Sequence, residues 1–270
     1  MKKQFKLGVI GYNLTSQTIL KGAVLSDFLH QKKIVVSCNA KNGSSVLDEL
    51  GVLVVDDVKF VVENSEFLLI AVKPKELESI VQNSGSVKPS KIISISDKIK
   101  KNDVKSLFGV SSVKVARALV NLPSAIGSGL IAVDMSDFNS DPDDVEFISN
   151  LFNCLGTVVS VDESQILAVS GLSVNGAAYA FMFIDSLIDA GVKQGLKKSE
   201  AKMIAVQTLL GSAEMVGLEE QTVSELTMLA CNNGGTALEG IKVLEEKNFR
   251  DIISEAVDKG VKKLNELETK

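Results

Sequence analysis

Short runs of apolar residues alternate with amphipathic segments over the first 160 or so residues of the chain. Such runs lie at residues 7–11, 34–38, 52–55, 67–72, 92–95, 113–120, 130–133 and 157–161. Runs that are apolar at successive positions indicate strands buried on both faces, as in a mostly parallel sheet covered by helices. The helices that would cover the sheet are predicted at residues 14–29, 46–50, 58–64, 77–83 and 141–155. This half of the chain is therefore predicted to be an α/β domain.

The strand pattern stops near Asp162, and the rest of the chain reads as helical. Helices are predicted at residues 164–190, 198–216, 223–230, 236–246 and 249–267. The helix through residues 177–184 is apolar on nearly every side, and a helix of this kind is buried all round. In a small helical domain such burial usually requires a partner subunit. We therefore predict two domains, residues 1–162 and residues 163–270, of which the second is an all-α dimerisation domain.

Composition limits the class of partner. The 270 residues carry a net charge of −5 with interspersed signs, which argues against a nucleic acid or an anionic membrane as partner. The longest apolar runs have the length of strands and fall short of a membrane span, and residues 1–6 do not resemble a signal peptide. Three widely spaced cysteines and a single histidine, His30, suggest neither a disulfide framework nor a metal site. A cytoplasmic protein with reduced thiols and no metal is expected.

Residues 8–16 place a glycine turn between the first strand and the first helix, where a dinucleotide-binding loop lies in a Rossmann-like domain. In the motif G-x-G-x-x-G, Gly11 fits, whereas Asn13 replaces the second glycine and Ser16 the third. Asparagine tolerates left-handed backbone angles, so the turn can form, but its side chain lies where the pyrophosphate would approach. The motif predicts a cofactor site at Gly11, Asn13 and Leu14. The alternative is a Rossmann-like scaffold with impaired cofactor binding.

Other strand ends carry further candidate contacts. The second strand ends at Ser37, and Asn39 and Lys41 follow, without an acid to bind the ribose hydroxyls of NAD. These polar groups are compatible with a 2′-phosphate and favour NADP, with NAD as the alternative, although an ordinary polar loop would look the same. Asn121 ends a later strand. At the end of the 67–72 strand, backbone groups could hold a nicotinamide ring, and the candidate residues are Ala71, Val72, Lys73 and Pro74.

A second glycine loop, residues 232–236, lies between two predicted helices. Gly234 and Gly235 let the backbone approach a ligand closely, and a helix restarts at Thr236. The N-terminus of a helix favours an anionic ligand such as a carboxylate. The alternative is a helical hairpin with a glycine-rich turn.

Several segments carry motifs of one known family. In the helical half they lie at residues 162–173, 176–181, 189–196, 207–213, 233–236, 244–250 and 255–257. In the first half, residues 71–74 read A-V-K-P and residues 117–123 match the pattern R-x-M-x-N-T-P. Together these segments resemble pyrroline-5-carboxylate reductase, the last enzyme of proline biosynthesis.

The resemblance implies that a cyclic imine is reduced with NAD(P)H bound to an N-terminal Rossmann domain. It also implies a helical domain that forms an intertwined homodimer, often within a larger homo-oligomer, and a substrate pocket between the helical-half loops of paired subunits. Backbone N–H groups of the glycine loop would hold the substrate carboxylate. The implied substrate contacts are Asn175, Asn232, Gly234, Gly235 and Thr236, and the candidate catalytic residues are Thr236 and Lys73. Since a protonated imine is already electrophilic, positioning can carry much of the acceleration.

Departures from the family pattern gather at the expected ligand sites. Asn13 replaces a loop glycine, Asn175 lies in the altered motif at residues 173–179, and residues 96–98 replace a usual A-A-G. Ala237 lacks the hydroxyl of the second threonine in the family's glycine loop. Two alternatives therefore stand beside a reductase of pyrroline-5-carboxylate. One is a divergent paralogue with weak or no catalysis, and the other is a reductase of a different small imino or keto acid.

Overall fold

The computed structural model describes residues 3–38, 45–96, 98–218, 220–231 and 235–268. Contacts along the chain divide it into two compact units. Unit 1 comprises Met1–Val174 and Val261–Lys270, and unit 2 comprises Asn175–Gly260. This division differs from a boundary at residue 162, because the α7 segment and the end of the last helix pack with the first unit. The domain boundary therefore stays a prediction.

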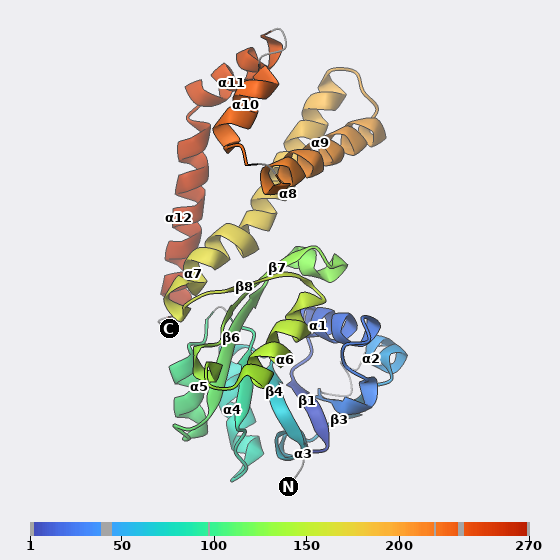
Figure 1. Ribbon diagram of the computed structural model, residues 1–270, viewed down its shortest axis with the longest axis vertical. Helices are drawn as coiled ribbons and strands as arrows, with labels where there is room; N and C mark the ends of the chain where they lie inside the picture. Colours follow the sequence, from blue (N-terminus) through green and yellow to red (C-terminus); the bar gives the residue numbers. More distant parts are fainter. Residues whose placement is uncertain (1–2, 39–44, 97, 219, 232–234, 269–270) are drawn as a thin grey trace. The chain divides into compact units, whose positions relative to one another are not determined.

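Unit 1 is built on an eight-stranded sheet with the order β3-β2-β1-β4-β5-β6-β7-β8 (Figure 1). The strands are β1 (Phe5–Ile10), β2 (Ile34–Ser37), β3 (Leu53–Val55), β4 (Ser65–Ile70), β5 (Lys91–Ser94), β6 (Lys114–Val120), β7 (Gly129–Asp134) and β8 (Gly156–Ser160). Neighbouring strands are parallel except β6 and β7. The strand order reverses between β1 and β4. Ligands of open α/β sheets bind outside the carboxyl ends of the strands at such a switch point.

Helices cover both faces of the sheet, so each strand contributes to two cores. On β4, Phe67 and Leu69 point into the first core, whereas Leu68 and Ile70 point into the second. The first core is closed by α1 (Leu14–Leu25), α2 (Ser45–Leu50) and α6 (Pro142–Asn153), and the second by α3 (Val58–Asn64), α4 (Pro74–Ser84) and α5 (Lys101–Phe108). This two-sided burial explains why the strands are apolar at successive positions. Short 3-10 helices are η1 (Gln31–Lys33), η3 (Leu122–Ile126), η4 (Ser136–Phe138) and η5 (Glu163–Gln165).

Helix α5 was not predicted from the sequence. Its eight residues offer only three large apolar positions, and this is too few for a clear helical period. Val104 and Phe108 are nevertheless fully buried in the second core. At the start of the helix, the Lys100 backbone N–H donates to the Asp103 carboxylate at 3.2 Å. Tertiary packing and this capping contact therefore make the segment helical, although its local sequence pattern does not predict a helix.

Unit 2 is helical, as predicted. It contains α8 (Asn175–Lys193), α9 (Lys198–Leu218), α10 (Val223–Cys231), α11 (Thr236–Glu246) and the first part of α12 (Phe249–Glu268). Its small core joins α8 and α9 through Ile188, Ala201 and Ala205. Many large apolar side chains remain exposed, among them Met182 on α8, which is 74% exposed. Within a single chain, the apolar helix through residues 177–184 therefore lacks the burial that its sequence demands.

The approach to α8 is a continuous helical stretch, Glu163–Lys193, that passes through α7 (Ile166–Val169) and a π-helical turn, η6 (Ser170–Val174). By length and composition alone this stretch is apolar enough to cross a membrane. Polar residues such as Ser170, Ser173 and Asn175 keep its uninterrupted apolar runs short of a membrane span, so the absence of a membrane partner stays a prediction. Single π-turns inside helices are rare and occur often at functional sites.

Candidate functional site

The turn between β1 and α1 is closed by Gly11, whose φ is +91°. A Cβ atom on this residue would lie 2.4 Å from the Val72 Cγ1 atom and 2.6 Å from the Ala71 carbonyl oxygen. The Gly11 backbone N–H donates to the Ser37 carbonyl oxygen at 3.2 Å. Only glycine fits this position, which brings the ends of β1, β2 and β4 together.

Asn13 caps α1 from the N-terminal side. Its Oδ1 atom accepts hydrogen bonds from the backbone N–H groups of Thr15 and Ser16, each at 3.0 Å. Its Nδ2 atom donates to the Ala71 carbonyl oxygen at 2.8 Å. The Asn13 backbone is extended, with φ −139°, so left-handed tolerance is not why asparagine fits here. Side-chain capping is the reason.

A cavity of about 560 Å³ opens at the switch point. Six of the predicted cofactor residues line it, namely Gly11, Asn13, Ser37, Ala71, Val72 and Lys73. They come from the ends of three neighbouring strands and the turns that follow them, which explains why residues far apart in sequence meet here. Asn39 and Lys41 lie outside the described residues. Pro74 is the first residue of α4.

Charged groups at this cavity come from α4 and from the end of β3. Lys73 is exposed, and its backbone N–H donates to the Glu76 carboxylate at 2.9 Å. Asp56, which follows β3, also lines the cavity and was not predicted as a site residue. Its position directly after a strand beside β2 was the available signal. Burial, and then the charge of Asp56, raise the pKa of the Cys38 thiol, so this cysteine is protonated at neutral pH and a poor nucleophile.

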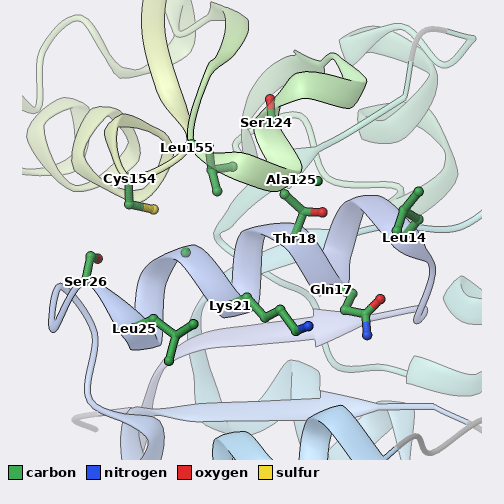
Figure 2. Close-up of a pocket in the computed structure, with 12 residues that line it drawn as sticks. Leu14, Gln17, Thr18, Lys21, Leu25, Ser26, Ser124, Ala125, Cys154 and Leu155 are labelled. Atoms are coloured by element: carbon green, nitrogen blue, oxygen red, sulfur yellow. The ribbon is translucent and has the colours of Figure 1, made fainter. Parts of the chain in front are cut away.

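A second cavity, of about 410 Å³, lies along α1 (Figure 2). Gln17 and Lys21 of α1 line it together with Cys154 and Leu155 at the end of α6. Leu14, predicted as a cofactor contact, has a side chain that is 61% exposed and lines this second cavity rather than the first. It is therefore separated from the six predicted contacts of the first cavity, although it lines a smaller cavity of about 200 Å³ together with Asn121, another predicted contact.

Asn121, at the end of β6, uses both ends of its amide for structural contacts. Its Oδ1 atom accepts from the Leu130 backbone N–H at 3.0 Å and from the Ser124 hydroxyl at 3.3 Å. Its Nδ2 atom donates to the Ser173 hydroxyl oxygen in the π-helical turn at 3.0 Å. The side chain thus ties the β6–η3 turn to η6, and a cofactor contact at this residue stays a prediction.

The glycine loop of unit 2 is described from Gly235 onward, so Asn232 and Gly234 lie outside the described residues. Gly235 has φ +81°, and Thr236 begins α11 where the sequence predicted a helix start. Asn175 begins α8, and a Cβ atom on Gly260 would lie 2.7 Å from its Nδ2 atom. Asn175 thus packs closely on α12. Among the residues that the structure describes, no group of three or more His, Cys, Asp or Glu residues could hold a metal ion.

Comparison with known proteins decides the family. The model of pyrroline-5-carboxylate reductase dimerisation matches residues 163–267, and the model of coenzyme F420-dependent NADP oxidoreductases matches residues 6–98. A pyrroline-5-carboxylate reductase from Aquifex aeolicus is 30% identical over 262 residues, which are 97% of each chain. The chain belongs to the pyrroline-5-carboxylate reductase family. This confirms the resemblance drawn from the sequence motifs.

Solved structures of pyrroline-5-carboxylate reductases share the fold. The enzyme from Coxiella burnetii has a TM-score of 0.85 at 25% identity, over 98% of each chain. The Plasmodium falciparum pyrroline carboxylate reductase, solved with NADP bound, has a TM-score of 0.86 at 24% identity, over 99% of this chain and 100% of that one. The predicted combination of a Rossmann-like domain and an all-α dimerisation domain is confirmed.

Proposed function

We propose that this protein is an oxidoreductase that reduces pyrroline-5-carboxylate to proline with NADPH. Six predicted cofactor contacts line one cavity at the switch point of a chain of this family, and this observation carries the proposal. The Aquifex aeolicus relative is a pyrroline-5-carboxylate reductase, and the Plasmodium falciparum relative has NADP bound.

The residues present fit a dinucleotide. Gly11 leaves a cradle that a Cβ atom would fill, and it lies between the ends of β2 and β4. Ser37 ends β2 without a following acid, which suits the 2′-phosphate of NADP, whereas Asp56 in the same cavity suits the ribose hydroxyls of NAD. NADP is the proposed cofactor and NAD the one to compare. Further proposed contacts are Asn13, Leu14, Asn39, Lys41, Ala71, Val72, Lys73, Pro74 and Asn121.

The substrate carboxylate is proposed to bind the glycine loop of unit 2. Gly235, with its left-handed backbone, and the N-terminal end of α11 offer N–H groups and a positive helix terminus to an anion. Asn232, Gly234 and Asn175 are the other proposed substrate contacts. When bound, NADPH supplies the hydride that the imine carbon accepts.

Two residues are proposed to act on the reacting groups. The Thr236 hydroxyl, exposed at the start of α11, would hydrogen-bond the ring nitrogen in place of the hydroxyl that Ala237 lacks. The Lys73 ammonium would place positive charge at the cofactor cavity. Positioning by these residues suffices for an imine that is already protonated.

The proposed assembly is a homodimer or a larger homo-oligomer in the cytoplasm. The match to the dimerisation model and the exposed apolar faces of unit 2 support self-association. The net charge of −5 does not favour a nucleic acid partner.

The test is NADPH oxidation with pyrroline-5-carboxylate, with proline measured as product. Thr236→Ala is expected to lower kcat/KM by about a hundredfold, since it removes a positioned hydroxyl, and Lys73→Ala by about tenfold. Thr208→Ala on α9 and Lys75→Ala on α4, both exposed and outside the site, are the matched controls and should stay within about twofold. Folded wild-type protein that forms no proline above background would refute the proposal. Turnover of other imino or keto acids in the same assay would then favour the alternative substrate.

A further inference from the structure

The chain itself occupies backbone N–H groups in the first turn of α1. Those of Thr15 and Ser16 donate to the Asn13 Oδ1 atom, each at 3.0 Å, and the Asn13 backbone N–H donates to the Ser16 hydroxyl oxygen at 2.9 Å. A helix that follows a glycine turn otherwise offers these groups to a phosphate. The amide oxygen of Asn13 therefore takes the place of a phosphate oxygen.

The other end of the Asn13 side chain is anchored to the sheet. Its Nδ2 atom donates to the Ala71 carbonyl oxygen at 2.8 Å, and the Ala71 backbone N–H in turn donates to the Ile10 carbonyl oxygen at 2.9 Å. Asn13 and Ala71 both line the 560 Å³ cavity. The side chain is thus held at both ends, from the start of α1 to the end of β4, within the space where the cofactor is proposed to bind.

We infer that Asn13 is an internal competitor for the pyrophosphate of the cofactor and sets the affinity for NADPH. This inference rests on the proposed function. Cofactor binding has to turn the Asn13 amide away from the Thr15 and Ser16 N–H groups, so the stability of the cap is subtracted from the binding free energy. Glycine at the same place in a dinucleotide-binding loop has no side chain to displace. Relative to glycine, the cap alone corresponds to about a twofold change in affinity, and the hydrogen bond from Nδ2 to the Ala71 carbonyl oxygen, which is lost with it, brings the total to about tenfold.

Two substitutions at this position are expected to shift the NADPH affinity in opposite directions. Asn13→Gly removes the competitor and is expected to tighten NADPH binding by about tenfold. Asn13→Asp keeps an acceptor for the N–H groups but adds a negative charge beside the pyrophosphate, and it is expected to weaken binding by at least about tenfold. Dissociation constants are measured by titrating full-length protein with NADPH and following the cofactor fluorescence.

Two further measurements separate competition from a purely structural role. Adenosine 2′-monophosphate, which lacks the pyrophosphate, should bind wild type and Asn13→Gly equally. In the absence of ligand, Asn13→Gly should melt at a lower temperature because α1 loses its cap, although it binds NADPH more tightly. Thr222→Gly is the control for cap loss alone. The Thr222 hydroxyl accepts from the Glu225 backbone N–H at 3.2 Å at the start of α10, so its loss should lower stability and leave the NADPH affinity unchanged.

The outcomes distinguish this inference from the proposed function. Wild-type turnover with an unchanged or weaker NADPH affinity in Asn13→Gly would overturn the competitor role alone. Tighter binding by Asn13→Gly with no turnover by either protein would support the competitor role and overturn the proposed activity. Folded wild type and Asn13→Gly that both fail to bind NADPH would overturn both.

Discussion

The two units of this chain bury their apolar residues in different ways. In unit 1, alternate residues of each strand enter two separate cores, and residues such as Leu7, Phe67 and Ile92 are fully buried. In unit 2, the buried core consists of three residues on α8 and α9, while Met182 and Met203 are 74% and 67% exposed. Unit 1 thus has two apolar cores of its own, whereas the helices of unit 2, which match the dimerisation model, carry an exposed apolar surface suited to a subunit interface.

The charged side chains of the two units differ in burial in the same way as the apolar ones. In unit 1, the Arg117 side chain is 1% exposed and donates to Glu268 at 2.8 Å, to Glu163 at 3.2 Å and to the Ser96 carbonyl oxygen at 3.1 Å. In unit 2, the Arg250 side chain is 78% exposed and pairs with Glu245 at 2.8 Å. Breaking these two contacts should therefore change the stability by very different amounts although their distances are similar, because only the buried pair is shielded from water.

Met182→Glu is expected to give the largest effect, because it places a charge on the apolar surface of unit 2. Burying an unpaired carboxylate in a subunit interface is strongly unfavourable, so the dissociation constant of the homodimer should rise by at least about thirtyfold. Analytical ultracentrifugation over a concentration series measures this constant.

Leu25→Glu is the matched control for this prediction. Leu25 lies on α1 in unit 1, and its exposure of 75% is close to the 74% of Met182. Unlike unit 2, however, unit 1 buries its core without a partner. The subunit dissociation constant should therefore be unchanged in this variant. If both substitutions raised the subunit dissociation constant equally, the two units would not differ in their need for a partner chain.

Arg117→Met tests the contrast in charged groups. Removing the arginine leaves Glu163 and Glu268 without their buried partner, although Glu268 keeps Lys100 at 3.2 Å. The free energy of unfolding in urea should fall by about 3 kcal/mol. Arg250→Met, the control on the surface of unit 2, should lower it by less than about 0.5 kcal/mol. A similar decrease in the free energy of unfolding in both variants would show that burial does not determine how much these ion pairs affect stability.

The sequence predicted the sheet well because the local pattern and the global fold agree there. A strand segment buried on both faces is apolar at successive positions, and β4 has this pattern from Phe67 to Ile70. The pairing of Arg117 with Glu268 could not be predicted, because the partners are 151 positions apart and leave no local pattern. The same limit applies to α5, since its two buried apolar residues, Val104 and Phe108, become anchors only when the second core exists.

The candidate site was predictable as far as topology determines it. Gly11, Ser37 and Lys73 follow strand ends, and the carboxyl ends of adjacent parallel strands meet at one edge of the sheet. The direction of individual side chains was not predictable. Leu14 turns toward a different cavity, and Asn13 caps its own helix, because both choices depend on contacts that form only in the folded chain.

The carboxylates around Lys101 give unit 1 an acid-sensitive contribution to stability. The Lys101 ammonium lies 2.9 Å from Asp134 and 3.2 Å from Asp137. Burial raises the pKa of Asp134, but hydrogen bonds from Ser136 and the ammonium of Lys101 outweigh it and hold the pKa below its ordinary value. For Asp137, burial is likewise outweighed by Lys105, the Val115 N–H and Lys101, and its pKa is lowered.

A carboxylate whose pKa is lowered by folding stabilises the protein at every pH above the ordinary pKa of about 4, and this stability is lost as the pH falls through the lower, folded pKa. The free energy of unfolding should therefore decline below about pH 4. Asp134→Asn should reduce the slope in that window by at most about 1.4 kcal/mol per pH unit, the effect of one proton. Urea unfolding at a series of pH values measures the slope, and Asp251→Asn, an exposed aspartate of unit 2, should leave it unchanged. If Asp251→Asn flattens the slope as much as Asp134→Asn does, the acid sensitivity does not come from the buried charges of unit 1.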